Sequence, residues 1–99
     1  MTVFNASLPA GEDCALKFIA NGMNLAGASV QWRLCDLESN DEVIVKAIGD
    51  GVDILSTAEG ILEVVFDTTG LSGSYEHECE LTDADNNTVM IANGILAIG

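Results

Sequence analysis

Hydrophobic and polar residues alternate along several short stretches of the chain. The clearest stretch is Ser74–Asp83, where Tyr75, His77, Cys79 and Leu81 are separated by single glutamates. Successive side chains of a strand point to opposite faces, so this period of two is typical of a strand with one buried face. No stretch sustains the period of about 3.6 residues that an amphipathic helix requires.

Similar stretches recur along the chain, with turn residues between them. The predicted strands are Cys14–Ala20, Ser29–Leu37, Glu42–Ile48, Val52–Leu55, Ile61–Asp67, Ser74–Asp83, Thr88–Ala92 and Gly94–Ile98. Turns are predicted at Asn21–Gly22, Gly49–Gly51 and Asp83–Asn87, and a bulge or bend at Gly94, because Gly, Asn and Asp favour such conformations. The inward face of Glu42–Ile48 is ambiguous, because this stretch is apolar on both faces.

The same alternation predicts which side chains fill the space between two sheets. These residues occupy the inward positions of the strands or the corner that leads into Tyr75. They are Cys14, Leu16, Phe18, Val30, Trp32, Leu34, Leu62, Val64, Phe66, Leu71, Gly73, Tyr75, Cys79 and Leu81. About seven short strands around such a core predict an all-β, antiparallel sandwich, formed by one domain over residues 1–99.

The charge of the chain is strongly acidic, with 16 Asp and Glu against three Lys and Arg and a net charge of −13. Phosphate contacts need clustered Lys and Arg, so nucleic-acid binding through a basic face is excluded and an anionic membrane surface is disfavoured. No apolar run approaches the roughly 20 residues of a membrane helix. The first residues lack the basic and apolar regions of a secretory signal, so we expect a protein kept in the cytosol or released with a particle.

The three cysteines do not suggest a disulfide scaffold or a zinc site, because their number is odd and no C-x-x-C pair occurs. The only histidine, His77, shares a strand face with Cys79, which formally allows a nucleophile and its base. That face is predicted to be core, however, and the chain has no G-x-S-x-G elbow. His77 is therefore interpreted as structural, and no catalytic residue and no cofactor are predicted.

Carboxylates gather in three places, and each has a structural explanation. Glu76, Glu78 and Glu80 form a stripe on one strand face, which predicts a solvated outer surface rather than a convergent site. The loop Asp36–Glu42 is interpreted in the same way.

The segment Asp83–Asn87 begins like a calcium loop, with Asp83, Asp85 and Asn87 at ligand spacing. Thr88 then stands where such a loop has Gly, and Gly94 stands where it has Glu. The segment is predicted to be a hairpin turn. These three residues remain weak candidates for calcium, and no metal site is assigned.

Two motifs resemble the immunoglobulin-like sandwich. Leu71-Ser72-Gly73-Ser74-Tyr75 is similar to the L-x-G-x-Y entry of its tyrosine corner, and Cys14 followed by Trp32 resembles its first cysteine and core tryptophan. The second cysteine of that family lies two residues after the tyrosine, where this chain has His77, and Cys79 follows two residues later. The resemblance implies an immunoglobulin-like fold of about seven strands. A Cys14–Cys79 bridge would be off register, and free thiols are favoured.

A second resemblance covers most of the chain. Leu25-Ala26-Gly27 precedes Val30-Gln31-Trp32-Arg33-Leu34, and the run from Thr69 to His77 precedes an Asp-rich hairpin. This order resembles small β-sandwich structural proteins of tailed bacteriophages. The resemblance implies a non-enzymatic virion component of the head surface, neck or tail, assembled in the cytoplasm of a host bacterium. Its partners would be other virion proteins and further copies of the chain.

Assembly would use open sheet edges and the apolar ends Met1–Leu8 and Ile95–Gly99, which can add to a neighbouring sheet. The alternative is an extracellular immunoglobulin-like module for adhesion or carbohydrate binding. The two hypotheses share a β-sandwich without an active site, and they differ in the partner.

Overall fold

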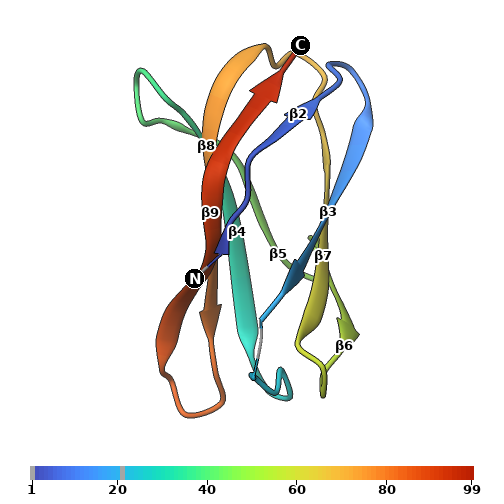
Figure 1. The fold of residues 1–99 in the computed structure, drawn as a ribbon, viewed down its shortest axis with the longest axis vertical. Helices are drawn as coiled ribbons and strands as arrows, with labels where there is room; N and C mark the ends of the chain where they lie inside the picture. The colour runs from blue at the N-terminus through green and yellow to red at the C-terminus, as the bar shows by residue number, and fades with distance from the viewer. Residues whose placement is uncertain (1, 21) are drawn as a thin grey trace.

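The described residues, 2–20 and 22–99 of this computed structural model, form nine β-strands (Figure 1). The strands are β1 (Thr2–Val3), β2 (Ala6–Leu8), β3 (Asp13–Ile19), β4 (Ser29–Asp36), β5 (Glu42–Ile48), β6 (Gly51–Ser56), β7 (Ile61–Asp67), β8 (Gly73–Thr82) and β9 (Thr88–Ile98). Over the same ranges no helix is long and apolar enough to cross a membrane. The turn predicted at Asn21–Gly22 includes Asn21, which lies outside the described residues.

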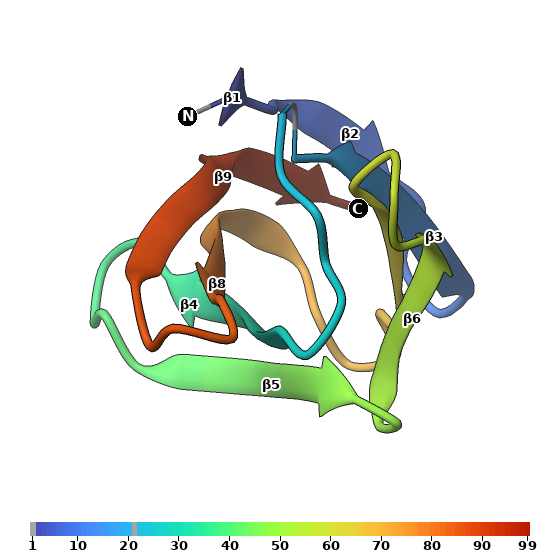
Figure 2. The same cartoon turned by 90° about the horizontal axis from the view of Figure 1, so that it is seen from below.

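The strands hydrogen-bond in the order β1-β9-β8-β4-β5-β6-β7-β3, and β2 also pairs with β9. The resulting sheet curls on itself, so that β9, β8, β4 and β5 form one layer and β6, β7 and β3 form the other (Figure 2). The chain turns the corner between layers at Gly49–Gly51, where β5 and β6 share a short parallel pairing of Ala47 with Gly51 and Ile48 with Val52. The predicted turn lies at this corner.

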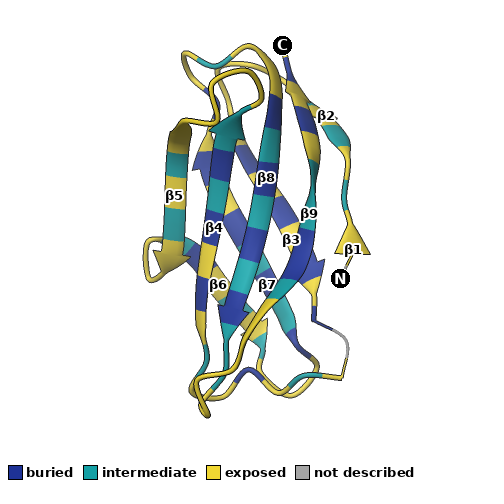
Figure 3. Ribbon diagram, turned by 90° about the vertical axis from the view of Figure 1, so that its left-hand side faces the viewer, coloured by how far each residue is buried: buried dark blue, intermediate teal, exposed yellow. Residues whose placement is uncertain are grey.

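The core lies between the two layers and follows the predicted alternation. Buried and half-buried residues alternate along β8, as Figure 3 shows from outside this layer. Trp32 is fully buried, and its ring packs on Phe66 from the opposite layer with centroids 4.6 Å apart. The buried members of the predicted set are Cys14, Leu16, Phe18, Val30, Trp32, Leu34, Leu62, Val64, Phe66, Tyr75, Cys79 and Leu81.

Two members of that set differ from the prediction. Leu71 is only partly buried and packs against the edge of the core. Gly73 is exposed, and its φ of 99° lies in a region that favours glycine. Gly73 therefore shapes the corner that precedes Tyr75 and fills no space in the core.

The described part of the N-terminal stretch that the sequence offered for exchange with a neighbour is paired within its own chain. Thr2–Val3 and Ala6–Leu8 run parallel to β9 of the same chain, with Thr2 opposite Ala92 and Ala6 opposite Leu96. The two apolar ends proposed for exchange between copies therefore pair with each other. The predicted antiparallel sandwich is confirmed by its main pairings, but it has nine strands instead of about seven, and the short pairings of β1 and β2 with β9 and of β5 with β6 are parallel.

The C-terminal stretch was predicted as two strands broken at Gly94, but Thr88–Ile98 is one strand. Its bulge lies at Ile91, because Cys79 pairs with Ala92 and Glu80 pairs with Met90. Gly94 instead allows the backbone of Phe4 to approach β9 closely. A Cβ at this position would overlap the carbonyl oxygen of Phe4 and lie 2.8 Å from Oδ1 of Asn5.

The predicted tyrosine corner is confirmed. The phenol of Tyr75 donates to the carbonyl oxygen of Ser72 at 3.0 Å and accepts from the Ser72 amide at 3.1 Å. The buried ring thus holds the connection between β7 and β8 against the core, and its phenol pairs with both backbone polar groups of Ser72.

We expect Tyr75→Phe to lower the free energy of unfolding by roughly 1 to 2 kcal/mol, because it removes both hydrogen bonds between the phenol and the Ser72 backbone. Urea unfolding followed by far-UV circular dichroism measures this loss. Ser72→Ala is the matched control, because both bonds use its backbone, and it should cost much less. Equal losses in the two variants would contradict this role of the phenol.

Candidate functional site

His77 lies at the centre of the core and is held by neutral partners on both ring nitrogens. Nε2 lies 2.6 Å from the carbonyl oxygen of Phe4, and the indole N–H of Trp32 donates to Nδ1 at 3.3 Å. An indole N–H can only donate and a carbonyl can only accept, so the imidazole is neutral with its proton on Nε2. Burial lowers the pKa of His77 below its ordinary 6.5, against smaller opposing effects of the Phe4 carbonyl and Glu76.

The formal pairing of His77 with Cys79 does not produce a nucleophile. Both side chains are fully buried, and burial raises the pKa of the Cys79 thiol to about 12. Because both nitrogens of His77 are already engaged, the ring has no free lone pair with which to take a thiol proton. Cys14, Cys35 and Cys79 are all free thiols.

A shallow cavity of about 280 Å³ lies between β3 and the pair β1–β9. It is lined mainly by apolar side chains, including Phe18, Ile19 and Ile91, and Lys17 is the only charged residue among the described residues of its walls. Those described walls hold no Asp, Glu, His or Cys that could act with Lys17 in acid–base chemistry.

The Asp83–Asn87 segment forms the hairpin turn that the sequence predicted. Oδ1 of Asp83 accepts the backbone N–H groups of Asp85 and Asn87, each at 2.9 Å, and Oδ2 accepts from the Asn87 side chain at 3.3 Å. These bonds lower the pKa of Asp83, and the bond from the backbone N–H of Asn87 has the largest effect. Both oxygens of Asp83, the first of the weak candidate calcium ligands, thus accept hydrogen bonds within the turn. Within residues 2–20 and 22–99, no three Asp, Glu, His or Cys side chains are grouped to hold a metal ion.

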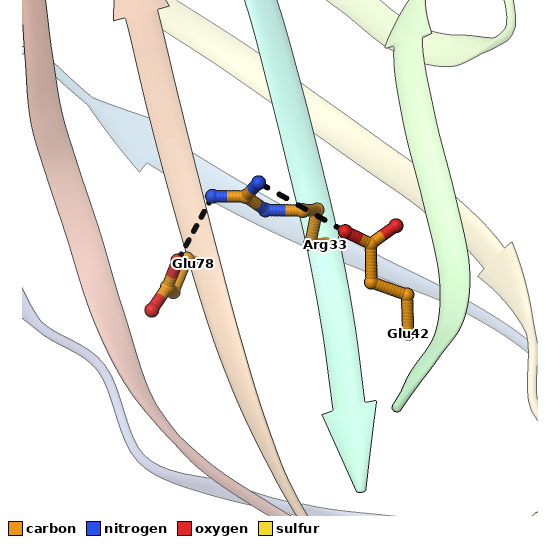
Figure 4. Close-up of polar contacts among 3 residues, drawn as sticks. All are labelled: Arg33, Glu42 and Glu78. Carbon is orange, nitrogen blue, oxygen red and sulfur yellow. Dashed lines mark hydrogen bonds and ion pairs between the residues drawn. The ribbon is translucent and has the colours of Figure 1, made fainter. Parts of the chain in front are cut away.

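The outer surface of the β9-β8-β4-β5 layer brings charges together from three strands. Arg33 of β4 donates to Oε2 of Glu78 on β8 at 3.1 Å, and its other terminal nitrogen lies 4.0 Å from Glu42 on β5 (Figure 4). The two glutamates thus flank one guanidinium, whose side chain is 28% exposed. An arginine already held in place by two carboxylates loses little freedom when a partner docks.

Further acidic and apolar residues surround the row Glu42–Arg33–Glu78 that these contacts form. We call the surface the acidic face and define it by Gln31, Arg33, Cys35, Glu42, Val45, Glu76, Glu78, Glu80 and Ile95. Glu76 and Glu80 flank Glu78 along β8, as the sequence predicted for an outer stripe. Val45 and Ile95 stand at its two sides and are 39% and 36% exposed. The face combines excess negative charge with exposed apolar side chains at its rim.

The sequence placed Arg33 on an outward position but did not pair it with Glu42 or Glu78. Those contacts depend on the registers of β4 with β5 and β8, and a bulge after Leu34 shifts the first of them. A detectable signal was the rarity of basic residues, because Arg33 is one of three in the chain.

Comparison with known proteins identifies the fold and no closer relationship. No family model matches the sequence, and no curated protein sequence matches it. A chain in the crystal structure of Dpr1 IG1 bound to DIP-eta IG1 aligns with a TM-score of 0.54 and 11% identity. The alignment covers 100% of this chain and 91% of that one. The chain has an immunoglobulin-like β-sandwich fold. The confirmed tyrosine corner and the buried Trp32 agree with this assignment.

Proposed function

We propose that this immunoglobulin-like domain is a non-enzymatic protein-binding module, and that its acidic face docks on a basic protein surface. The observation that carries the proposal is the row Glu42–Arg33–Glu78 across three strands of an outer sheet surface. The surrounding glutamates leave this face with unbalanced negative charge. A complementary positive surface would be steered toward it and held in one orientation.

The contact made by a similar fold supports this choice. In the crystal structure that aligns with this chain, one IG domain is bound to another. Burial of the aromatic residues argues against the carbohydrate-binding alternative, since sugars usually stack on exposed rings. Trp32, Phe66, Phe18 and Tyr75 are buried, and Phe4 is half-buried.

The charge of the acidic face favours binding to a different protein over binding to a second copy of this chain. A symmetric dimer would place the glutamate stripe of one copy on the same stripe of the other, and like charges at an interface are costly. The net charge of −13 adds repulsion over longer distances. The partner is therefore inferred to be a distinct protein with a basic surface.

A virion as the setting of this contact, and assembly in a bacterial cytoplasm, rest on the phage resemblance alone and stay predictions. They are compatible with the proposed chemistry, because a neighbouring virion protein with a basic patch would satisfy it. The adhesion setting requires the same face and a different partner.

We expect the triple variant Glu76→Gln, Glu78→Gln, Glu80→Gln to lose at least about tenfold in partner affinity, which corresponds to roughly 1.4 kcal/mol. The assay selects binders of the wild-type chain from a displayed library of immunoglobulin-like domains, then measures their affinity by biolayer interferometry. Affinity should also fall as salt is raised, because the contact is electrostatic.

The matched control removes three carboxylates from the outer surface of the opposite layer, by Asp13→Asn, Asp53→Asn and Glu63→Gln. This control should bind like the wild type. Binders that lose affinity for the control and keep it for the triple variant would place the docking surface elsewhere. A library that returns no binder would also count against the proposal.

A further inference from the structure

The backbone between β1 and β2 is locked onto β9 by contacts at Phe4 and Asn5. The Phe4 amide donates to the carbonyl oxygen of Asn93 at 2.7 Å, and Oδ1 of Asn5 accepts from the Ile95 amide at 2.8 Å. Gly94 lies between these two bonds and permits the close approach. We call residues 2–8 the N-terminal strap.

His77 binds this strap from inside the core. Its Nε2–H donates to the Phe4 carbonyl oxygen at 2.6 Å, and its ring stands edge-on to the Phe4 ring with centroids 5.9 Å apart. Phe18 of β3 stacks against the imidazole at 5.8 Å and stands edge-on to the Phe4 ring at 5.6 Å, so the three rings form one cluster. The strap is only partly buried, with Thr2, Val3, Asn5 and Ser7 exposed.

The groups that face the imidazole are uncharged on every element packed around it. They are Trp32 and Leu34 of β4, Phe18 of β3, Phe4 of the strap and Gly94 of β9. On its own strand, Cys79 shares the inward face and keeps its proton, while Glu76 and Glu78 point outward. No carboxylate among the described residues contacts the ring to compensate a positive charge.

Protonation of His77 would create two conflicts in this arrangement. Nδ1 would gain a proton and point it at the indole N–H of Trp32, which can only donate. The positive charge would also sit in an apolar core without a counter-ion. Water can reach the ring most cheaply by displacing the strap, because the strap is held on β9 through two short strands, whereas the other covering residues belong to longer strands.

We propose that His77 is a pH-sensitive latch: its neutral form holds the N-terminal strap on β9, and its protonation releases the strap and bares the backbone edge of β9. The rest of the sandwich remains folded during this step. The proposal concerns the core and the strap, so it stands independently of the acidic face.

The sign of the pH dependence follows from the lowered pKa of the folded state. In the unfolded chain the pKa of His77 has its ordinary value of 6.5, whereas burial in the latched state lowers this pKa. The latch is therefore most stable above that pH, and its stability falls progressively as pH falls below it. The carboxylates with lowered pKa values, Asp67 and Asp83, affect stability only at much lower pH.

Amide hydrogen exchange by NMR tests the latch on the full chain. Between about pH 7.5 and about pH 5, we expect protection factors to fall at least tenfold at the amides of Phe4, Ile95 and Gly99, each bonded across the strap. Core amides such as those of Trp32 and Val64 should keep their protection. The single histidine provides its own titration signal in the same samples, and that titration should coincide with the loss.

His77→Gln is the matched variant, because its terminal amide can still donate to the Phe4 carbonyl and does not titrate. Its strap protection should not depend on pH. Should this variant fail to fold, the wild-type data decide alone. A strap that stays protected while His77 is protonated overturns the proposal, and so does simultaneous loss of protection in strap and core.

Discussion

Replacing Trp32 with alanine is expected to lower the free energy of unfolding by about 4 kcal/mol, more than any other substitution proposed for this chain. The side chain is fully buried and packs on Phe66 across the two layers. Its removal leaves a cavity where the layers meet, and it also leaves Nδ1 of His77 without a donor. A domain of this size has only about 5 to 15 kcal/mol of stability to lose.

Two further variants separate the causes of this loss. Trp32→Phe keeps an aromatic ring against Phe66 but removes the N–H donor and some volume, so its cost should be roughly 2 kcal/mol. Val65→Ala, on an exposed position of β7, should cost less than about 1 kcal/mol. Trp32 is the only tryptophan, so its two variants have no tryptophan fluorescence to follow. Urea titrations monitored by far-UV circular dichroism therefore serve all three variants. A loss for Trp32→Ala no larger than for Val65→Ala would contradict the central place given to this residue.

Gly94→Ala is expected to cost roughly 2 to 4 kcal/mol although it adds a single methyl group. The new Cβ would overlap the carbonyl oxygen of Phe4, and that backbone atom cannot rotate away as a side chain could. The strap must then move, and Nε2 of His77 loses its acceptor. We therefore expect two effects together: lower stability, and loss of exchange protection at the Phe4 and Ile95 amides even at neutral pH.

Gly70→Ala is the matched control for this substitution. Gly70 has a φ of 81°, and open space surrounds the position that a Cβ would take, so alanine there meets backbone strain without a clash. Its cost should be about 1 kcal/mol, with strap protection unchanged. If the Gly94→Ala variant retained exchange protection at the Phe4 and Ile95 amides, this would contradict the close packing of Phe4 on β9.

Local sequence was sufficient for strands whose inner and outer residues differ. Along β8, alternation of Tyr75, His77, Cys79 and Leu81 with glutamates correctly predicted the buried face. The tyrosine corner was equally predictable, because its phenol bonds a residue only three positions earlier. The two strands of the strap, Thr2–Val3 and Ala6–Leu8, were not predicted. They are too short to show an alternation of polar and apolar residues, and they pair with residues about 90 positions away.

The candidate sites show the same division. The hairpin at Asp83–Asn87 was predicted correctly, since its bonds connect neighbouring residues. The row on the acidic face was not predicted, because Arg33 meets Glu42 and Glu78 through two strand registers. The first of these registers contains a bulge after Leu34 that no local pattern marks.

By itself, the sequence of this protein determined its all-β class, the inward set around Trp32, the turns and the acidic charge. The strands, turns and inward positions follow from residues a few positions apart, and the charge follows from composition alone, so none of them requires knowledge of the fold. Only the tertiary structure decided that the N-terminal strap lies on β9, that His77 joins Trp32 to Phe4, and that Arg33 lies between two glutamates. Those contacts connect distant residues, so strand order and register, set by burying the whole core at once, determine them.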